Sequence, residues 1–185
     1  SLRIAADARA GPAAPAPIPT STGLGGFQGL SLEYDPPRAG AVANITFRYV
    51  PMMVMDSPDV LTLTLPGFTG PPYSSAPMSP PFGHAYWTAA TFNLTVTLMQ
   101  STEIFSDQAA IFPDSLGVQL PAFGIVANSP TLLVSSNAAR GQVVPTVIPV
   151  SPPIGYFEEP RLFFTMPRIA SGETTVFTFK TVVQM

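Results

Sequence analysis

The sequence of 185 residues predicts an all-β protein built as an antiparallel β-sandwich. Three observations lead to this prediction. Apolar and polar residues alternate in several short segments, which is the pattern of a strand with one face in the core and the other in water. The chain has 23 prolines and 14 glycines, and clusters of these residues separate the alternating segments. Apolar residues nowhere keep helical spacing over three turns without an intervening proline.

The predicted strands follow in order along the chain. The clearest alternation runs from Asn44 to Val50, where Ile45, Phe47 and Tyr49 share one face. The other strands predicted in this way are 60–65, 92–98 and 175–181. Breakers such as Asp35-Pro36-Pro37 and Pro66-Gly67 should end strands, because proline cannot donate to a ladder. Several short strands with such loops are typical of a sandwich that is immunoglobulin-like in the broad sense.

The composition excludes several classes of function. Charged residues make up 10% of the chain and the net charge is −3, so a basic surface for nucleic acid is not expected. Cysteine is absent and His84 is the only histidine, which removes disulfides, thiolate sites and multi-histidine metal sites. No apolar run is long enough to span a membrane. We therefore expect no catalytic site, no metal, no cofactor, no nucleic acid and no membrane insertion.

The first ten residues alternate like a strand with one apolar face. The apolar side includes Leu2, Ile4, Ala6 and Ala8. The segment Gly11–Thr20, rich in alanine and proline, is expected to be an extended, polyproline-like tether. A strand on such a tether suits β-augmentation, in which it pairs with the open sheet edge of a neighbour. The alternatives are a short alanine-rich helix and a plain linker.

Two distant parts of the chain resemble each other. Leu32–Ala39 is similar to Leu162–Ile169 at an offset of 130 residues, and Ile45–Arg48 is similar to Phe177–Lys180 at an offset of 132. If this is repetition, the chain holds one complete domain and the first two strands of another, which are not stable alone. The alternative is that β-hairpins simply look alike. The predicted organisation is a strand and tether (1–22), a sandwich (23–154) and a strand pair (155–185).

Two sequences match the acceptor pattern for N-glycosylation. They are Asn44-Ile45-Thr46 and Asn93-Leu94-Thr95. In both predicted strands the asparagine lies opposite the core residues, so glycans at Asn44 and Asn93 would project into solvent. The alternative is that two threonine-rich strand faces match a loose pattern. Segments rich in proline, serine and threonine are also candidates for O-glycosylation.

Residues with catalytic or binding chemistry are few. His84 could act as a general base only with a carboxylate and a nucleophile, and the sequence indicates neither. The segment Asp56-Ser57-Pro58-Asp59 has too few oxygen ligands for calcium and is predicted to be a proline turn. Tyr86 and Trp87 could stack on sugar rings, and the alternative is an aromatic pair in the core.

The sequence from Ser31 to Val50, followed by Leu61-Thr62-Leu63-Thr64-Leu65-Pro66-Gly67-Phe68-Thr69-Gly70, resembles a known family. It is similar to the tandem immunoglobulin-like repeats of large secreted surface proteins in algae and other protists. The resemblance covers 26–70 and again 155–182. The chain departs from the family pattern at Met52–Asp59, where members have a short Ala-Gly turn. The resemblance implies a structural or adhesive role in an extracellular coat or filament, with no catalytic residues.

These observations predict a structural subunit of an extracellular glycoprotein fibril or surface appendage. Its partners would be copies of itself, joined head to tail by strand complementation, and N-linked or O-linked glycans. A head-to-tail contact does not close on itself and so builds filaments. The alternative is a carbohydrate-binding or adhesive module at the cell surface, with Tyr86 and Trp87 as sugar contacts. A hydrolase that uses His84 is a third reading.

Overall fold

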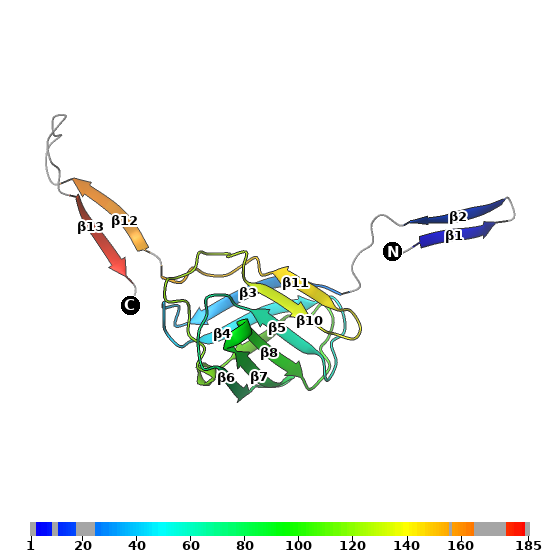
Figure 1. Ribbon diagram of the computed structural model, residues 1–185, viewed down its shortest axis with the longest axis horizontal. Helices are drawn as coiled ribbons and strands as arrows, with labels where there is room; N and C mark the ends of the chain where they lie inside the picture. Colours follow the sequence, from blue (N-terminus) through cyan, green and yellow to red (C-terminus); the bar gives the residue numbers. More distant parts are fainter. Residues whose placement is uncertain (1–2, 9–10, 18–24, 156, 165–176, 184–185) are drawn as a thin grey trace.

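The computed structural model describes residues 3–8, 11–17, 25–155, 157–164 and 177–183. Almost all regular structure in these ranges is β-strand (Figure 1). Two 3₁₀ turns, η1 (Ala89–Thr91) and η2 (Asp114–Leu116), complete it. The strands are β1 (Arg3–Ala8), β2 (Gly11–Pro17), β3 (Phe27–Asp35), β4 (Asn44–Pro51), β5 (Val60–Thr64), β6 (Tyr73–Pro77), β7 (Phe82–Thr88), β8 (Asn93–Leu98), β9 (Gln108–Phe112), β10 (Leu133–Ser136), β11 (Val143–Val147), β12 (Phe157–Phe164) and β13 (Phe177–Val183).

Nine of these strands, β3 to β11, form two antiparallel sheets that pack face to face (Figure 1). One sheet has six strands in the order β11-β10-β5-β8-β7-β6, and the other has three in the order β3-β4-β9. The all-β antiparallel sandwich that the sequence predicts is therefore confirmed. The outermost strand β11 carries Pro145, and β6 ends at Pro77. Proline at a sheet edge removes a donor that could pair with another chain.

The core lies between the two sheets and follows the alternation read from the sequence. In β4, Ile45, Phe47 and Tyr49 are buried, while Arg48 is exposed on the opposite face. The same alternation appears in β5 and β8, which pair with each other at the centre of the six-stranded sheet. Burial of these faces removes apolar surface from water at about 25 cal/mol per Å², which is the main stabilising contribution.

The predicted strands agree with the structure to within two residues at each end. Strands 44–50, 60–65, 92–98 and 175–181 correspond to β4, β5, β8 and β13. The segment Asp56–Asp59 is a turn that leads into β5, as its proline predicts. In the part of the chain that the structure describes, no helix is long and apolar enough to cross a membrane.

The terminal strands form two separate hairpins. β1 pairs with β2, and β12 pairs with β13, each as an antiparallel sheet of two strands that shares no ladder with the sandwich (Figure 1). The expected tether therefore differs from the structure over Gly11–Pro17. This segment is extended, but it pairs with β1 instead of running free. Pairing satisfies backbone N–H and C=O groups of β1 that a free polyproline-like segment would leave to solvent.

Candidate assembly and glycosylation sites

The predicted assembly strand corresponds to β1. Ile4 lies in this strand with 63% of its surface exposed. Ala6 and Ala8 belong to the same strand, whereas Leu2 lies outside the described residues. Because β1 and β2 form a sheet of only two strands, each has one edge that pairs with no described residue. β1 thus combines an exposed apolar residue with an open backbone edge.

The predicted C-terminal strand pair corresponds to β12 and β13. Their ladder runs from the pair Phe157 and Val183 to the pair Phe164 and Phe177. A register shift between Glu158 and Arg161 marks a bulge. A two-stranded sheet buries little surface, so this hairpin also offers two edges to a neighbour.

The two acceptor asparagines begin two strands of different sheets. Asn44 is the first residue of β4, and Asn93 is the first residue of β8. The backbone N–H of Asp114 donates to Asn44 Oδ1 at 2.9 Å, and the Thr64 hydroxyl donates to Asn93 Oδ1 at 3.0 Å. These bonds use the amide oxygens and not the nitrogens, to which an N-glycan would attach. Both residues are half-buried and lie opposite the core-facing positions, so they belong to the two outer faces of the sandwich.

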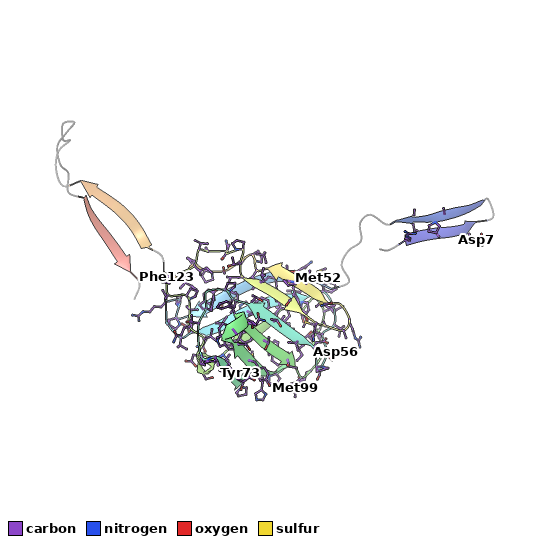
Figure 2. The ribbon with its side chains drawn as sticks, viewed as in Figure 1. Asp7, Met52, Asp56, Tyr73, Met99 and Phe123 are labelled. Atoms are coloured by element: carbon purple, nitrogen blue, oxygen red, sulfur yellow. The ribbon has the colours of Figure 1, made fainter. Side chains whose placement is uncertain are left out.

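Tyr86 and Trp87 lie on opposite faces of β7, because successive side chains of a strand alternate between its two faces. Trp87 is fully buried, so it cannot contact a sugar, and its role as a sugar contact is wrong. Tyr86 lies on the outer face, where its ring stacks on Tyr73 at 6.1 Å between centroids. Tyr73 is 60% exposed at the surface of the edge strand β6 (Figure 2). The sequence did not single out Tyr73, because its approach to Tyr86 depends on the pairing of β6 with β7.

His84 lies next to this aromatic pair. Its ring is 6.3 Å from that of Tyr86, and the side chain is exposed. Within the described ranges no three residues among histidine, cysteine, aspartate and glutamate cluster in a way that could hold a metal ion.

The turn Asp56–Asp59 holds two loops together. The buried Asp59 carboxylate accepts hydrogen bonds from the backbone N–H groups of Asp56 at 2.8 Å and Ala139 at 3.2 Å. Arg140 Nε lies 3.0 Å from the Asp56 carboxylate, and the Ser101 hydroxyl donates to that carboxylate as well. The carboxylates of this turn thus have protein partners and join β5 to the loop that follows β10.

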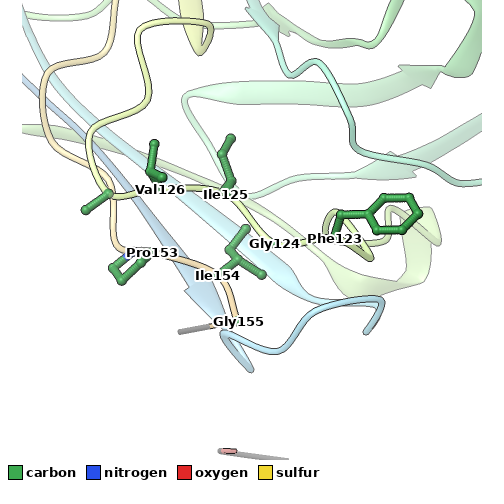
Figure 3. Close-up of a pocket in the computed structure, with 8 residues that line it drawn as sticks. Phe123, Gly124, Ile125, Val126, Pro153, Ile154 and Gly155 are labelled. Atoms are coloured by element: carbon green, nitrogen blue, oxygen red, sulfur yellow. The ribbon is translucent and has the colours of Figure 1, made fainter. Parts of the chain in front are cut away.

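A shallow apolar groove lies where the chain leaves the sandwich (Figure 3). It is lined by Phe123, Ile125, Val126, Pro153, Ile154 and Gly155, among others. Phe123 and Val126 are strongly exposed. Sequence reasoning missed this groove because it forms where the loop around Ile125 meets the segment around Ile154, which are joined by a backbone bridge.

The comparisons with known proteins add one structural likeness. No family model matches the chain, and no curated protein matches it. One similar solved structure is an uncharacterized protein from Nocardia farcinica, whose crystal structure reveals an immunoglobulin-like fold. The likeness has a TM-score of 0.43 at 15% identity and covers 81% of this chain and 96% of the other. The assignment of an antiparallel β-sandwich of the immunoglobulin-like kind follows from the two sheets described above.

Proposed function

We propose that this chain is a structural subunit of an extracellular glycoprotein fibril or surface appendage, and that copies join head to tail by β-strand complementation. The observation that supports this function is the pair of terminal hairpins, each a two-stranded sheet separate from the sandwich. Isolated hairpins of this size are marginally stable in water. A neighbouring copy that pairs with a hairpin would bury its open edge and its apolar face.

The chemistry of β1 favours such a contact. Ile4 exposes apolar surface beside the free edge of the strand, so pairing would gain both backbone hydrogen bonds and burial. A contact between different surfaces of two copies does not close after two molecules and continues into a filament.

The two glycan acceptors fit the same function. Asn44 and Asn93 begin β4 and β8, on the two outer faces of the sandwich. Neither strand pairs with a strand of the terminal hairpins. Glycans at these positions would coat the sandwich and leave the hairpins free to pair. This arrangement supports secretion and an extracellular location.

The experiment is electron microscopy of the chain secreted from a eukaryotic host, combined with intact-mass measurement. We expect filaments, and a mass increase that becomes smaller in Asn44→Gln and in Asn93→Gln and disappears in the double variant. Ile4→Asp should abolish the filaments because it places a charge on the apolar face of β1. Ala5→Asp, on the neighbouring position of the same strand, is the matched control and should leave them intact. Isolated particles from the unaltered chain would refute assembly, and an unmodified mass would refute glycosylation.

A second candidate function is carbohydrate binding at the outer face of β6 and β7. The stacked rings of Tyr73 and Tyr86 form an exposed aromatic surface, and His84 lies beside it as a hydrogen-bonding group. Aromatic surfaces with a polar neighbour suit the apolar faces of sugar rings. Binding on a glycan array that is lost in Tyr73→Ala, with the fold intact, would favour this function. Trp87→Ala would not test it, because Trp87 is part of the core.

A further inference from the structure

The C-terminal hairpin repeats the register of a hairpin inside the sandwich. In β3–β4 the ladder contains a bulge between Gln28 and Ser31, and in β12–β13 the bulge lies between Glu158 and Arg161. Adding 130 to each residue number of β3 and 132 to each of β4 reproduces the described pairs of β12–β13. The pair Phe27/Pro51 corresponds to Phe157/Val183, the pair Leu32/Phe47 to Leu162/Phe179, and the pair Tyr34/Ile45 to Phe164/Phe177.

The N-terminal hairpin repeats a different one. In β10–β11 the register shifts between Val134 and Ser136, and in β1–β2 it shifts between Ile4 and Ala6. Here an offset of 130 applies to both strands. The pair Arg3/Pro17 corresponds to Leu133/Val147, the pair Ile4/Ala16 to Val134/Thr146, and the pair Ala6/Ala13 to Ser136/Val143. The glycines that precede β11 and begin β2, Gly141 and Gly11, both have positive φ.

The sequence carries the same offset without a gap over the first 38 residues. Identical residues recur 130 positions later through the N-terminal hairpin, the segment after it and the first half of β3–β4. They include Leu2 and Leu132, Ala8 and Ala138, Gly11 and Gly141, Pro15 and Pro145, Ile18 and Ile148, Pro19 and Pro149, Ser21 and Ser151, Gly25 and Gly155, Phe27 and Phe157, Leu32 and Leu162, and Arg38 and Arg168. A chance likeness between hairpins would not keep one offset across the N-terminal hairpin, the segment after it and the strand β3.

The equivalent positions inside the sandwich show what each terminal hairpin lacks. β10 pairs with β5 on the side away from β11, and β4 pairs with β9 on the side away from β3. Val134, the equivalent of Ile4, is fully buried, whereas Ile4 is mostly exposed. Among the residues that the structure describes, β1 therefore has no neighbour equivalent to β5, and β13 has none equivalent to β9.

We infer that the two hairpins are pieces of neighbouring copies of this sandwich: β1–β2 closes the preceding copy, and β12–β13 opens the following one. One whole unit then runs over 25–154, which spans 130 residues and is equal to the offset. In the neighbouring copies β1–β2 takes the place of β10–β11 beside the strand equivalent to β5, and β12–β13 takes the place of β3–β4 beside the strand equivalent to β9. Within the sandwich described here β10 and β4 already occupy those edges. This inference deepens the proposed function, because it names the strands through which copies are joined.

The position of the apolar groove agrees with this arrangement. Gly155, which lines the groove, is the last described residue before β12, and the exposed Phe123 lines the groove as well. The groove thus lies at the exit from one unit, where the following copy would begin. Contact with that copy would cover apolar side chains that the single sandwich leaves in water.

The test is a fusion in which residues 1–183 are followed directly by a second copy of residues 52–154. Val183 corresponds to Pro51, so β12–β13 replaces β3–β4 in the second copy. We expect the second copy to fold and the amide hydrogens of β12 and β13 to exchange about a hundredfold more slowly than in the 185-residue chain, because they gain partners. A control that joins Gly155 directly to Met52 lacks the hairpin, and its second copy should stay unfolded. An unfolded second copy in the full fusion, or a folded one in the control, would overturn the inference.

Two matched variants of the fusion test the register. Leu162 corresponds to the buried Leu32, and Phe163 corresponds to the exposed Glu33. Leu162→Asp should therefore remove the amide protection of β12 and β13, while Phe163→Asp should keep it. Equal behaviour of the two variants would contradict the inferred equivalence. Because the fusion supplies the neighbour within one chain, success here without filaments of the 185-residue chain would reject assembly between separate molecules and retain the repeat.

Discussion

The packing around Gly70 allows a stability prediction that depends on which atoms can move. A Cβ added at Gly70 would lie 2.9 Å from the carbonyl oxygen of Gly117 and 2.9 Å from Nε1 of Trp87. The first is backbone at the end of η2, and the second belongs to a fully buried side chain in the core. Neither atom can withdraw without shifting the structure around it. Gly70→Ala should therefore carry the cost of an overpacked core.

The magnitude follows from comparison with Gly83. A Cβ at Gly83 would lie closer still, 2.7 Å from Cγ of Met99, but Met99 is 64% exposed at the surface (Figure 2) and can rotate away. Overpacking in a well-packed core typically costs about 1–3 kcal/mol. We expect Gly70→Ala to lower the free energy of unfolding by about 3 kcal/mol, and Gly83→Ala to change it by less than about 0.5 kcal/mol, as for an ordinary surface substitution.

The assay is urea unfolding followed by the fluorescence of Trp87, which is the only tryptophan of the chain and lies at the perturbed site. The midpoint should fall in Gly70→Ala at an unchanged slope, because the same surface is exposed on unfolding. If the two variants lost equal stability, or if Gly83→Ala lost more, the distance from the added Cβ to its nearest atom would by itself determine the loss of stability. The reasoning from the mobility of the contacted atoms would then be wrong.

Three further predictions concern pH, hydrogen bonding and the repeat. Burial raises the pKa of the Tyr34 and Tyr49 hydroxyls, so the unfolded chain ionises near pH 10 while the folded chain does not. Below that pH these two groups should not change the free energy of unfolding, and above it they should lower it. In urea unfolding at increasing alkaline pH, replacing both tyrosines by phenylalanine should remove most of this decrease. Asp59→Ala should lower the free energy of unfolding by about 3 kcal/mol, because two backbone N–H groups lose their acceptor. Val134→Asp should cost about 3 kcal/mol or more by burying an unpaired charge, whereas Ile4→Asp should leave the unfolding of the sandwich unchanged.

Each of these predictions has a result that would contradict it. An alkaline stability loss that persists without both tyrosines would assign the titration to other groups. Asp107→Ala removes an exposed carboxylate and is the control for Asp59→Ala; equal losses in the two would refute a specific role for the hydrogen bonds. A measurable loss of sandwich stability in Ile4→Asp would mean that the N-terminal hairpin packs on the sandwich of its own chain.

Much of the sandwich can be predicted from the sequence because strand alternation is a local property. The period of two in β4, β5 and β8 identifies the core-facing residues before any pairing is known. Prolines mark where strands end for an equally local reason, since they lack a donor. The likeness between 32–48 and 162–180 is also visible in the sequence.

The aromatic surface depends on contacts between distant segments. Alternation in β7 puts Tyr86 and Trp87 on opposite faces, but only the packing of the sheets decides that the face of Trp87 is the buried one. The approach of Tyr73 to Tyr86 requires the pairing of β6 with β7.

For the N-terminal segment, the sequence by itself determined an extended strand in which apolar and polar residues alternate. The tertiary structure decided which segment this strand pairs with. Alanine and proline in Gly11–Pro17 are compatible with both a free polyproline segment and a strand, because the backbone angles of the two are close. Hydrogen bonds to β1 select the strand, and their register matches that of β10–β11. Pairing is a property of two segments together, which is why the local pattern of one could not reveal it.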